Sequence, residues 1–448
     1  MTAPGPRRTL PTAMAIRGLV ALVAALAVLS AAAARPEPPA AAAATVLRCG
    51  RLLDPATRRV ATNALIVVRD GRIAAAGPDL EVPPGATVID LSSRTVLPGF
   101  IDAHVHLLLQ GDVTDAEYDA QIYGESLPYR ALRGAAAARL ALARGFTTLR
   151  DIGNEGGGFA DVDLKKAIDR GILPGPRLLV ATKALAPTGA YGPHGWSWLL
   201  DLPKGVESCD GEDDCRRAVR DQIAHGADWI KVYADRSYGR TAEGGWQSVP
   251  NFTRAELTAI VEEARRWRRP VAAHSMTPTG HALALAAGVT SIEHGAVIDD
   301  STARQMASQG VFLVPTIQAL KAVAPGRAAA GGPVWLDLLA EGKRSFARAK
   351  AAGVKIAFGT DAGAFSWQDV NAAVEFANMV EYGMTPWEAI ASATTVAADL
   401  LGKSGTIGSV APGAAADLVA VAGDPLADIH ALESVVFVMQ GGRVVSGP

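Results

Sequence analysis

LPGFIDAHVHL, residues 97–107, is an apolar run that ends in two histidines one residue apart. Alternate residues on a strand share a face, so His104 and His106 point the same way, about 6.5 Å apart along the chain. Two neutral imidazoles that converge in this way suit a bound metal ion better than they suit core packing. One such pair is weak evidence by itself, so further ligands must be sought elsewhere in the sequence.

The same kind of short apolar run, rich in Val, Ile, Leu and Thr, recurs along the chain. Ala-rich stretches with helical periodicity, such as 130–145 and 257–269, lie between the runs. Together with the run that ends at His104, eight strand–helix units predict an α/β fold of the (β/α)8 barrel type. The other seven runs are 147–153, 177–182, 228–234, 270–275, 290–295, 311–316 and 354–361.

The two flanks of the barrel region have a different character. Residues 45–96 and 403–448 contain short alternating strands, with a D-G turn in the first flank and a G-G turn in the second. We expect these flanks to meet in one small β-sandwich, with the barrel of residues 97–402 inserted between them. Residues 387–402 are expected to form the last helical segment of the barrel.

Polar side chains occupy the ends of several predicted strands, where barrel active sites lie. Any one of them has a structural explanation: Asp361 could form a turn, and Lys231 could rest its stem on apolar neighbours. Four of the chain's eight histidines nevertheless fall at strand ends. Taken together at this spacing, these residues favour one shared functional site over unrelated structural roles: His104, His106, Lys231, His274, His294 and Asp361.

Lys231 lies between Ile230 and Val232, where an unpartnered ammonium group would be costly to bury. A neutral amine can react with carbon dioxide to form a carbamate, whose two oxygens can bridge two metal ions. The alternative is that Lys231 remains a cation and binds a substrate carboxylate.

In these motifs the sequence resembles the amidohydrolase superfamily, especially its exported prolidase-like and imidazolonepropionase-like members. The resemblance covers nearly everything after the leader, including GVTSIEHG, FGTDAG, ADLV, GDPL and MQGGRVV. It implies two divalent ions, usually zinc. One ion would be held by His104, His106, carboxylated Lys231 and Asp361. The other would be held by Lys231, His274 and His294.

The resemblance also implies cleavage of a C-terminal amino acid from a dipeptide or N-acyl amino acid, a small peptide-like substrate with a free carboxylate. A hydroxide bridging the two metals would attack the amide, with Asp361 as the catalytic proton carrier. No G-x-S-x-G motif suggests a serine nucleophile. Hydrolysis of cyclic amides or lactones, or deamination, is the alternative. A non-catalytic relative would be expected to lack ligands, and here all six positions are filled.

Substrate contacts are expected from the loop GAYGPHGW (189–196) and from the fourth strand. Tyr191 and His194 lie in the loop, and Tyr233 shares a face with Lys231 because it follows two residues later. A phenol and an imidazole could bind the substrate's carboxylate. The other interpretation is a loop packed by its own aromatic residues.

The N-terminus is typical of an export signal. Arg17 precedes an apolar stretch, 18–30, and the small residues AAAAR follow, so 1–44 are expected to be a signal peptide and spacer. The predicted location is periplasmic or secreted, with no stable membrane anchor after cleavage. An uncleaved anchor is the alternative, and Met14 could be the true start. A net charge of −2 argues against a nucleic-acid partner, and a homo-oligomer is possible.

Three cysteines are present. Cys209 and Cys215, in SCDGEDDCRR, are close enough in sequence to form a disulfide in an oxidising compartment, although the sequence does not fix their geometry. Cys49 is most simply a buried thiol.

Overall fold

The computed structural model describes Gly5 and residues 44–191, 195–197 and 199–447. The predicted signal segment and Met14 therefore lie outside the described residues. Within those residues, no helix combines the length and apolar character needed to cross a membrane.

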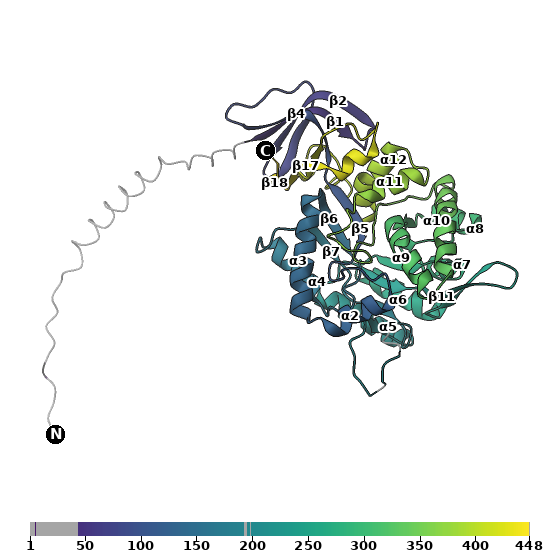
Figure 1. The fold of residues 1–448 in the computed structure, drawn as a ribbon. Helices are drawn as coiled ribbons and strands as arrows, with labels where there is room; N and C mark the ends of the chain where they lie inside the picture. Colours follow the sequence, from purple (N-terminus) through teal and green to yellow (C-terminus); the bar gives the residue numbers. More distant parts are fainter. Residues whose placement is uncertain (1–4, 6–43, 192–194, 198, 448) are drawn as a thin grey trace. The chain divides into compact units, whose positions relative to one another are not determined.

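The two flanks meet, as predicted, but they form one continuous sheet of seven strands rather than two separate sheets (Figure 1). Its order is β18-β17-β16-β4-β1-β2-β3. The long strand β4 joins the halves, because it pairs in parallel with β1 and its last residues, 95–98, pair antiparallel with β16. The strands are β1 (Thr45–Asp54), β2 (Arg59–Arg69), β3 (Arg72–Gly77), β4 (Thr87–Pro98), β16 (Leu418–Val421), β17 (Val435–Gln440) and β18 (Arg443–Ser446).

The predicted barrel region contains two parallel sheets, ordered β5-β6-β7 and β15-β14-β13-β10-β8-β9. Seven of the eight predicted runs coincide with named parallel strands. This arrangement is consistent with a (β/α)8 barrel. The strands are β5 (Phe100–Val105), β6 (Phe146–Asp151), β7 (Arg177–Val180), β8 (Ala184–Ala186), β9 (Val206–Ser208), β10 (Ile230–Tyr233), β13 (Val271–Ser275), β14 (Ser291–His294) and β15 (Phe312–Val314).

The eighth run, 354–361, is extended but irregular. It is held on one side by a parallel bridge between Leu313 and Ile356, and on the other by a bridge between Val105 and Ala362. The run therefore connects β15 to β5, although it is not a regular strand.

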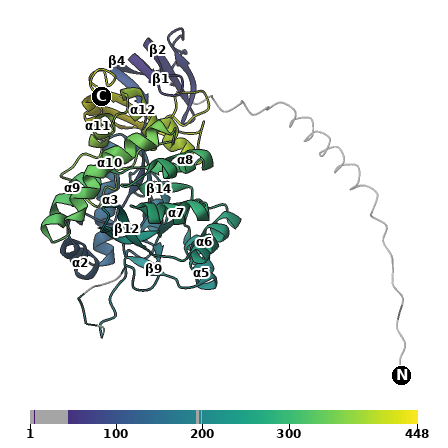
Figure 2. The same cartoon turned by 90° about the vertical axis from the view of Figure 1, so that its right-hand side faces the viewer.

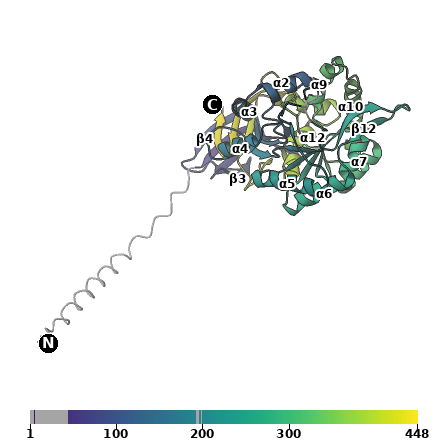
Figure 3. The ribbon, with the colours of Figure 1, turned by 90° about the horizontal axis from the view of Figure 1, so that it is seen from below.

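Helices follow the parallel strands, and α4, α5, α6 and α7 succeed one another around them in Figure 3. In Figure 2, helices α7, α8, α9 and α10 lie around strand β14 on the face turned to the viewer. Helix α3 begins at Leu127, earlier than the predicted 130, because Ser126 caps it. The helices are α2 (Asp115–Gly124), α3 (Leu127–Ala143), α4 (Ala160–Asp169), α5 (Glu212–His225), α6 (Arg254–Arg266), α7 (Pro278–Ala287), α8 (Asp300–Gln309), α9 (Ile317–Ala329), α10 (Val334–Ala351) and α11 (Val374–Glu381).

The predicted last helical segment, 387–402, is helical but not uniform. It consists of α12 (Pro386–Ala391), a π-helical turn η1 (Ser392–Val396) and α13 (Ala397–Leu400). A short 3₁₀ turn, η2 (Ile429–Glu433), precedes β17.

An antiparallel hairpin, β11 (Asp235–Arg240) and β12 (Trp246–Pro250), leaves the barrel directly after β10. This hairpin was not predicted from the sequence. Ser237 has a φ of 57°, and this left-handed residue lies between Arg236 and Tyr238, both of which line the pocket described next.

Candidate metal centre

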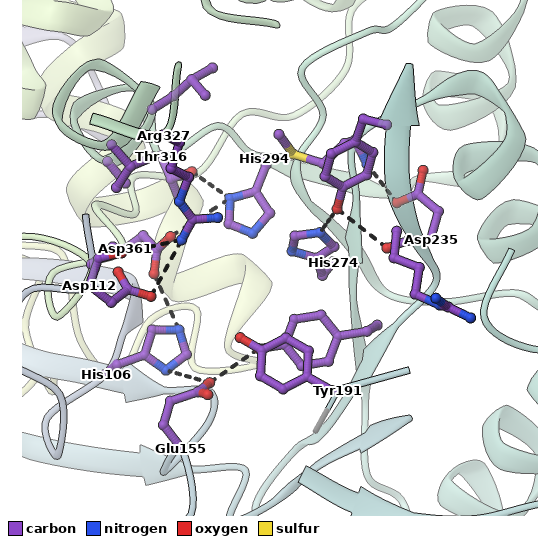
Figure 4. Close-up of a pocket in the computed structure, with 18 of the residues that line it drawn as sticks. His106, Asp112, Glu155, Tyr191, Asp235, His274, His294, Thr316, Arg327 and Asp361 are labelled. Atoms are coloured by element: carbon purple, nitrogen blue, oxygen red, sulfur yellow. Dashed lines mark hydrogen bonds and ion pairs between the residues drawn. The ribbon is translucent and has the colours of Figure 1, made fainter. Parts of the chain in front are cut away.

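The six predicted ligands gather at the carboxyl ends of the parallel strands. Five of them line one pocket: His106, Lys231, His274, His294 and Asp361. His104 is fully buried behind them, with its ring centroid 5.4 Å from that of His106 and 5.0 Å from that of His294. Figure 4 shows His106, His274, His294 and Asp361 around the same space.

Three of these residues form a compact ligand group. One ligand atom each from His104, His106 and Asp361 lies within 4.8 Å of the others. Asp361 Oδ1 is 3.5 Å from His104 Nε2 and 3.2 Å from His106 Nε2. Its other oxygen, Oδ2, is 4.0 Å from His294 Nδ1. The carboxylate therefore lies among three imidazoles that come from two different strands.

Backbone pairing between β5 and the eighth run produces this closeness. The amide of Asp361 donates to the carbonyl of His104 at 2.7 Å, and the amide of His106 donates to Ala362 at 2.8 Å. Asp361 and His294 both have left-handed backbones, with φ of 57° and 70°. Such conformations cost about 1–3 kcal/mol in non-glycine residues and cluster at functional sites.

Hydrogen bonds at Nδ1 fix the orientation of the His104 and His106 rings. His104 Nδ1 lies 2.8 Å from Glu293 Oε2, and His106 Nδ1 lies 2.7 Å from the carbonyl of Gly153. Each Nδ1 therefore carries a proton, and in His104 this leaves the Nε2 lone pair free. Burial opposes the protonation of His106, but the carboxylates of Asp361 and Glu155 outweigh burial and raise its pKa to about 9. His104 Nε2 is buried without a hydrogen-bond partner among the described residues. An unpaired buried acceptor beside a carboxylate fits a divalent metal ion.

The other two histidines are also oriented by neighbours. His274 Nε2 lies 2.5 Å from the hydroxyl of Tyr238, and His294 Nδ1 lies 2.8 Å from the hydroxyl of Thr316. Burial lowers the pKa of His104, His274 and His294 well below the usual value. The three rings are therefore neutral, the form that binds metals.

Lys231 is almost completely buried, with 1% of its surface exposed. Burial lowers its pKa to about 8, although the carboxylates of Glu293 and Asp361 act in the opposite direction. Its Nζ lies 5.6 Å from the centroid of the Tyr233 ring. About a tenth of this amine is therefore uncharged at pH 7, far more than for an ordinary lysine.

A buried ion pair that was not predicted from the sequence contacts the histidine cluster. Arg150 Nη2 lies 2.9 Å from Glu293 Oε1, and both side chains are fully buried. Glu293 in turn contacts His104, so the pair sets the orientation of that ring. The available signal was two opposite charges inside apolar runs, TTLRDIG and TSIEHG.

Replacing Arg150 with methionine is expected to destabilise the protein by about 3–5 kcal/mol, because it leaves the Glu293 charge buried without a partner. Urea denaturation measures the loss. The double variant Arg150→Met/Glu293→Gln should recover much of it, since no lone charge then remains. A double variant as unstable as the single one would contradict this explanation.

Two of the three predicted substrate contacts line the pocket. Tyr191 and Tyr233 line the pocket and stack on each other at 4.6 Å, whereas His194 lies outside the described residues. The hydroxyl of Tyr233 donates to Glu155 Oε1 at 3.1 Å, so this phenol already has an anionic partner. Glu155, which follows β6, also lines the pocket and was not predicted from the sequence.

Two arginines also line the pocket. Arg327 lies 3.6 Å from Asp112 Oδ2. Arg236 is exposed, and it has no ion-pair partner within the described part of the chain. Both also line an adjoining pocket, which shares Asp112 and Tyr191 with the first. Both arginines lie in segments without strand periodicity, so no sequence pattern pointed to them.

Known proteins resemble this chain along most of its length. The model of the Amidohydrolase family matches residues 95–445. Ochratoxinase of Aspergillus niger is 31% identical over 440 residues, covering 90% of this chain and 87% of that enzyme. Imidazolonepropionase of Salinispora arenicola is 28% identical over 369 residues, covering 80% and 85%. A crystal structure of a Xaa-Pro dipeptidase with methionine bound in its active site matches with a TM-score of 0.81 and 32% identity, covering 90% of this chain and 100% of that one.

Proposed function

This chain belongs to the amidohydrolase family and is a metal-dependent hydrolase of carbon–nitrogen bonds, and from that premise we propose a two-metal site and a substrate class. The proposed substrates are dipeptides or N-acyl amino acids with a free C-terminal carboxylate. The observation that carries the proposal is the convergence of four imidazoles, a carboxylate and a buried amine in one region of the fold.

The residues divide into two ligand sets. His104, His106 and Asp361 would hold one cation, and His274 and His294 the other, with Lys231 as a carbamate between them. Zinc suits this set of nitrogen and oxygen donors. When bound, the two ions would lower the pKa of water and polarise the scissile carbonyl.

Asp361 is the group best placed to move a proton. Burial opposes its ionisation, but His104, His106 and Lys231 outweigh burial and lower its pKa. Its side chain is 15% exposed and lines the pocket, so the carboxylate is ionised and within reach of a substrate. We propose that it accepts the proton of the attacking water and delivers it to the leaving amine.

The substrate carboxylate needs a cation that is not already engaged. Lys231 would be consumed by the carbamate, and Arg327 lies beside Asp112. Arg236 is exposed at the junction of the two pockets, and we propose that it binds the carboxylate. The Xaa-Pro dipeptidase relative, whose structure holds methionine in its active site, supports a substrate that ends in an amino acid.

Replacing Arg236 with methionine is expected to raise KM for N-acyl amino acids about 10–100-fold, with little change in kcat, because one charge-assisted hydrogen bond is lost. Steady-state kinetics on an acyl amino acid and on its carboxamide measures the effect. The carboxamide should be insensitive to the change. Arg240→Met, farther along the same hairpin, is the matched control and should behave as wild type.

The proposal as a whole is tested by incubating the zinc-loaded protein with libraries of dipeptides and N-acyl amino acids. Mass spectrometry should detect released free amino acids, and a chelator should abolish their release. Ring opening of cyclic amides, without activity on linear ones, would instead favour an imidazolonepropionase-like reaction.

Location is a separate proposal. The leader of residues 1–44 supports export to the periplasm or medium, which fractionation of cells that express the full chain would test.

A further inference from the structure

We propose that Cys209 and Cys215 form a disulfide that fastens the end of strand β9 to helix α5. Their sulfur atoms lie 2.6 Å apart, and both residues are fully buried. Each thiol faces the other and neither can turn to solvent, an arrangement suited to a covalent bond. Cys49, the third cysteine, is buried in β1 within the seven-stranded sheet.

Local backbone structure directs the two side chains toward each other. Cys209 directly follows β9, and its amide donates to the carbonyl of Ala186 at 3.1 Å. Cys215 lies in the first turns of α5, where its amide donates to Gly211 at 3.0 Å. Gly211 has a φ of 75°, which glycine adopts without strain, so the chain reverses within a few residues. The turn between Cys209 and Cys215 therefore already has the shape that a disulfide between them needs.

Bond formation requires an oxidant, and we infer a small-molecule or protein disulfide. One cysteine thiolate attacks that disulfide and displaces a thiolate, forming a mixed disulfide. The second cysteine then attacks the mixed disulfide, so that the Cys209–Cys215 bond forms and a second thiol leaves. Two cysteine thiols are oxidised, and one external disulfide is reduced to two thiols. An oxidising compartment supplies such a partner.

The bond would act on the pocket through the residue that follows Cys209. Asp210 accepts hydrogen bonds from Thr188, at 2.9 Å from its amide and 2.6 Å from its hydroxyl. Three residues after Thr188, Tyr191 lines the pocket and stacks on Tyr233. The disulfide would therefore hold Asp210 still and keep Tyr191 in place against Tyr233.

Peptide mapping tests the bond directly. The protein is refolded from a reduced, denatured state in a glutathione redox buffer, then denatured, alkylated and digested with trypsin. Cleavage after Lys204 and Arg216 leaves both cysteines in one peptide, residues 205–216. We expect this peptide to be two hydrogens lighter and unalkylated, and to take two alkyl groups only after reduction. Cys49 should be alkylated in both samples.

Alkylation of both Cys209 and Cys215 without reduction would overturn the proposal, as would a linkage of either one to Cys49. This readout needs no substrate, so it is independent of the proposed amide hydrolysis.

The double variant Cys209→Ala/Cys215→Ala tests the consequence of the bond. We expect its Tm to fall by about 3 °C, because the bond between residues 209 and 215 no longer restricts the unfolded chain. We expect its KM to rise several-fold, because Asp210 no longer holds Thr188 and Tyr191 firmly in place. Wild-type protein kept in reductant should show the same changes, and the variant itself should not respond to reductant. Cys49→Ala is the matched control and should keep its response to reductant. If reduction changes neither Tm nor KM of the wild type, the link between the disulfide and the pocket is refuted.

Discussion

The Asp361→Asn variant is expected to lose about 10²–10⁴-fold in kcat while it keeps its fold. An amide has nearly the size of the carboxylate but cannot accept the proton of the attacking water. The carboxylate lies 3.2 Å from His106 Nε2 and 3.5 Å from His104 Nε2, so the variant should also bind one metal ion more weakly. Steady-state kinetics at saturating zinc separates the loss of rate from the loss of metal.

Asp369→Asn is the matched control, because Asp369 lies in the same segment and is exposed. It should retain wild-type kcat and metal content. A fully zinc-loaded Asp361→Asn protein with wild-type kcat would remove Asp361 from proton transfer.

Lys231→Ala is expected to abolish measurable turnover and to reduce bound zinc from two ions to one or none per chain. The side chain is buried among the other five clustered residues, and its loss would remove the proposed bridge between the two ligand sets. Metal content is measured by mass spectrometry of the desalted protein. Addition of formate or another small carboxylate should restore part of the activity, because it supplies two oxygens in the vacated space.

Lys183→Ala serves as control, since Lys183 pairs with Glu207 outside the pocket. Two zinc ions and full activity in Lys231→Ala would contradict a bridging lysine.

The proposed carbamate on Lys231 also predicts how the rate of activation by zinc depends on pH. Carbon dioxide reacts with the neutral amine, and the neutral fraction grows as pH rises through the Lys231 pKa of about 8. At constant dissolved carbon dioxide, activation of metal-free protein by zinc should therefore be about 25-fold faster near pH 8.5 than near pH 6.5. The rate of recovery of activity after mixing measures this. A rate independent of pH would contradict carbamate formation as the slow step.

The sequence predicted the strands and their polar ends because both follow from local patterns. An apolar run gives a strand, and the (β/α)8 arrangement places residues such as His104 and Asp361 at the same end. The short alternating strands in both flanking segments also predicted that these segments meet. The continuous sheet was not predicted, because it depends on β4 being long enough to pair with both β1 and β16.

The missed residues depend on contacts that no local pattern encodes. Arg150 and Glu293 are separated by 143 residues in the chain and meet only across the barrel interior. Tyr238 reaches His274 through a hairpin whose sequence has no strong strand pattern. The irregular eighth run was predicted as a strand because its apolar composition matches one, although its backbone makes only isolated bridges. The predicted export, the identity of the metal and the role of His194 stay predictions.

The long strand β4 has a consequence for biosynthesis. Its partner β16 begins at Leu418, so the sheet that begins with β1 stays incomplete until the last tenth of the chain has been made. A ribosome-bound intermediate therefore exposes the edge of β4, a surface prone to pair with other chains. Truncation after residue 417 should accordingly produce an aggregating product rather than a smaller soluble enzyme.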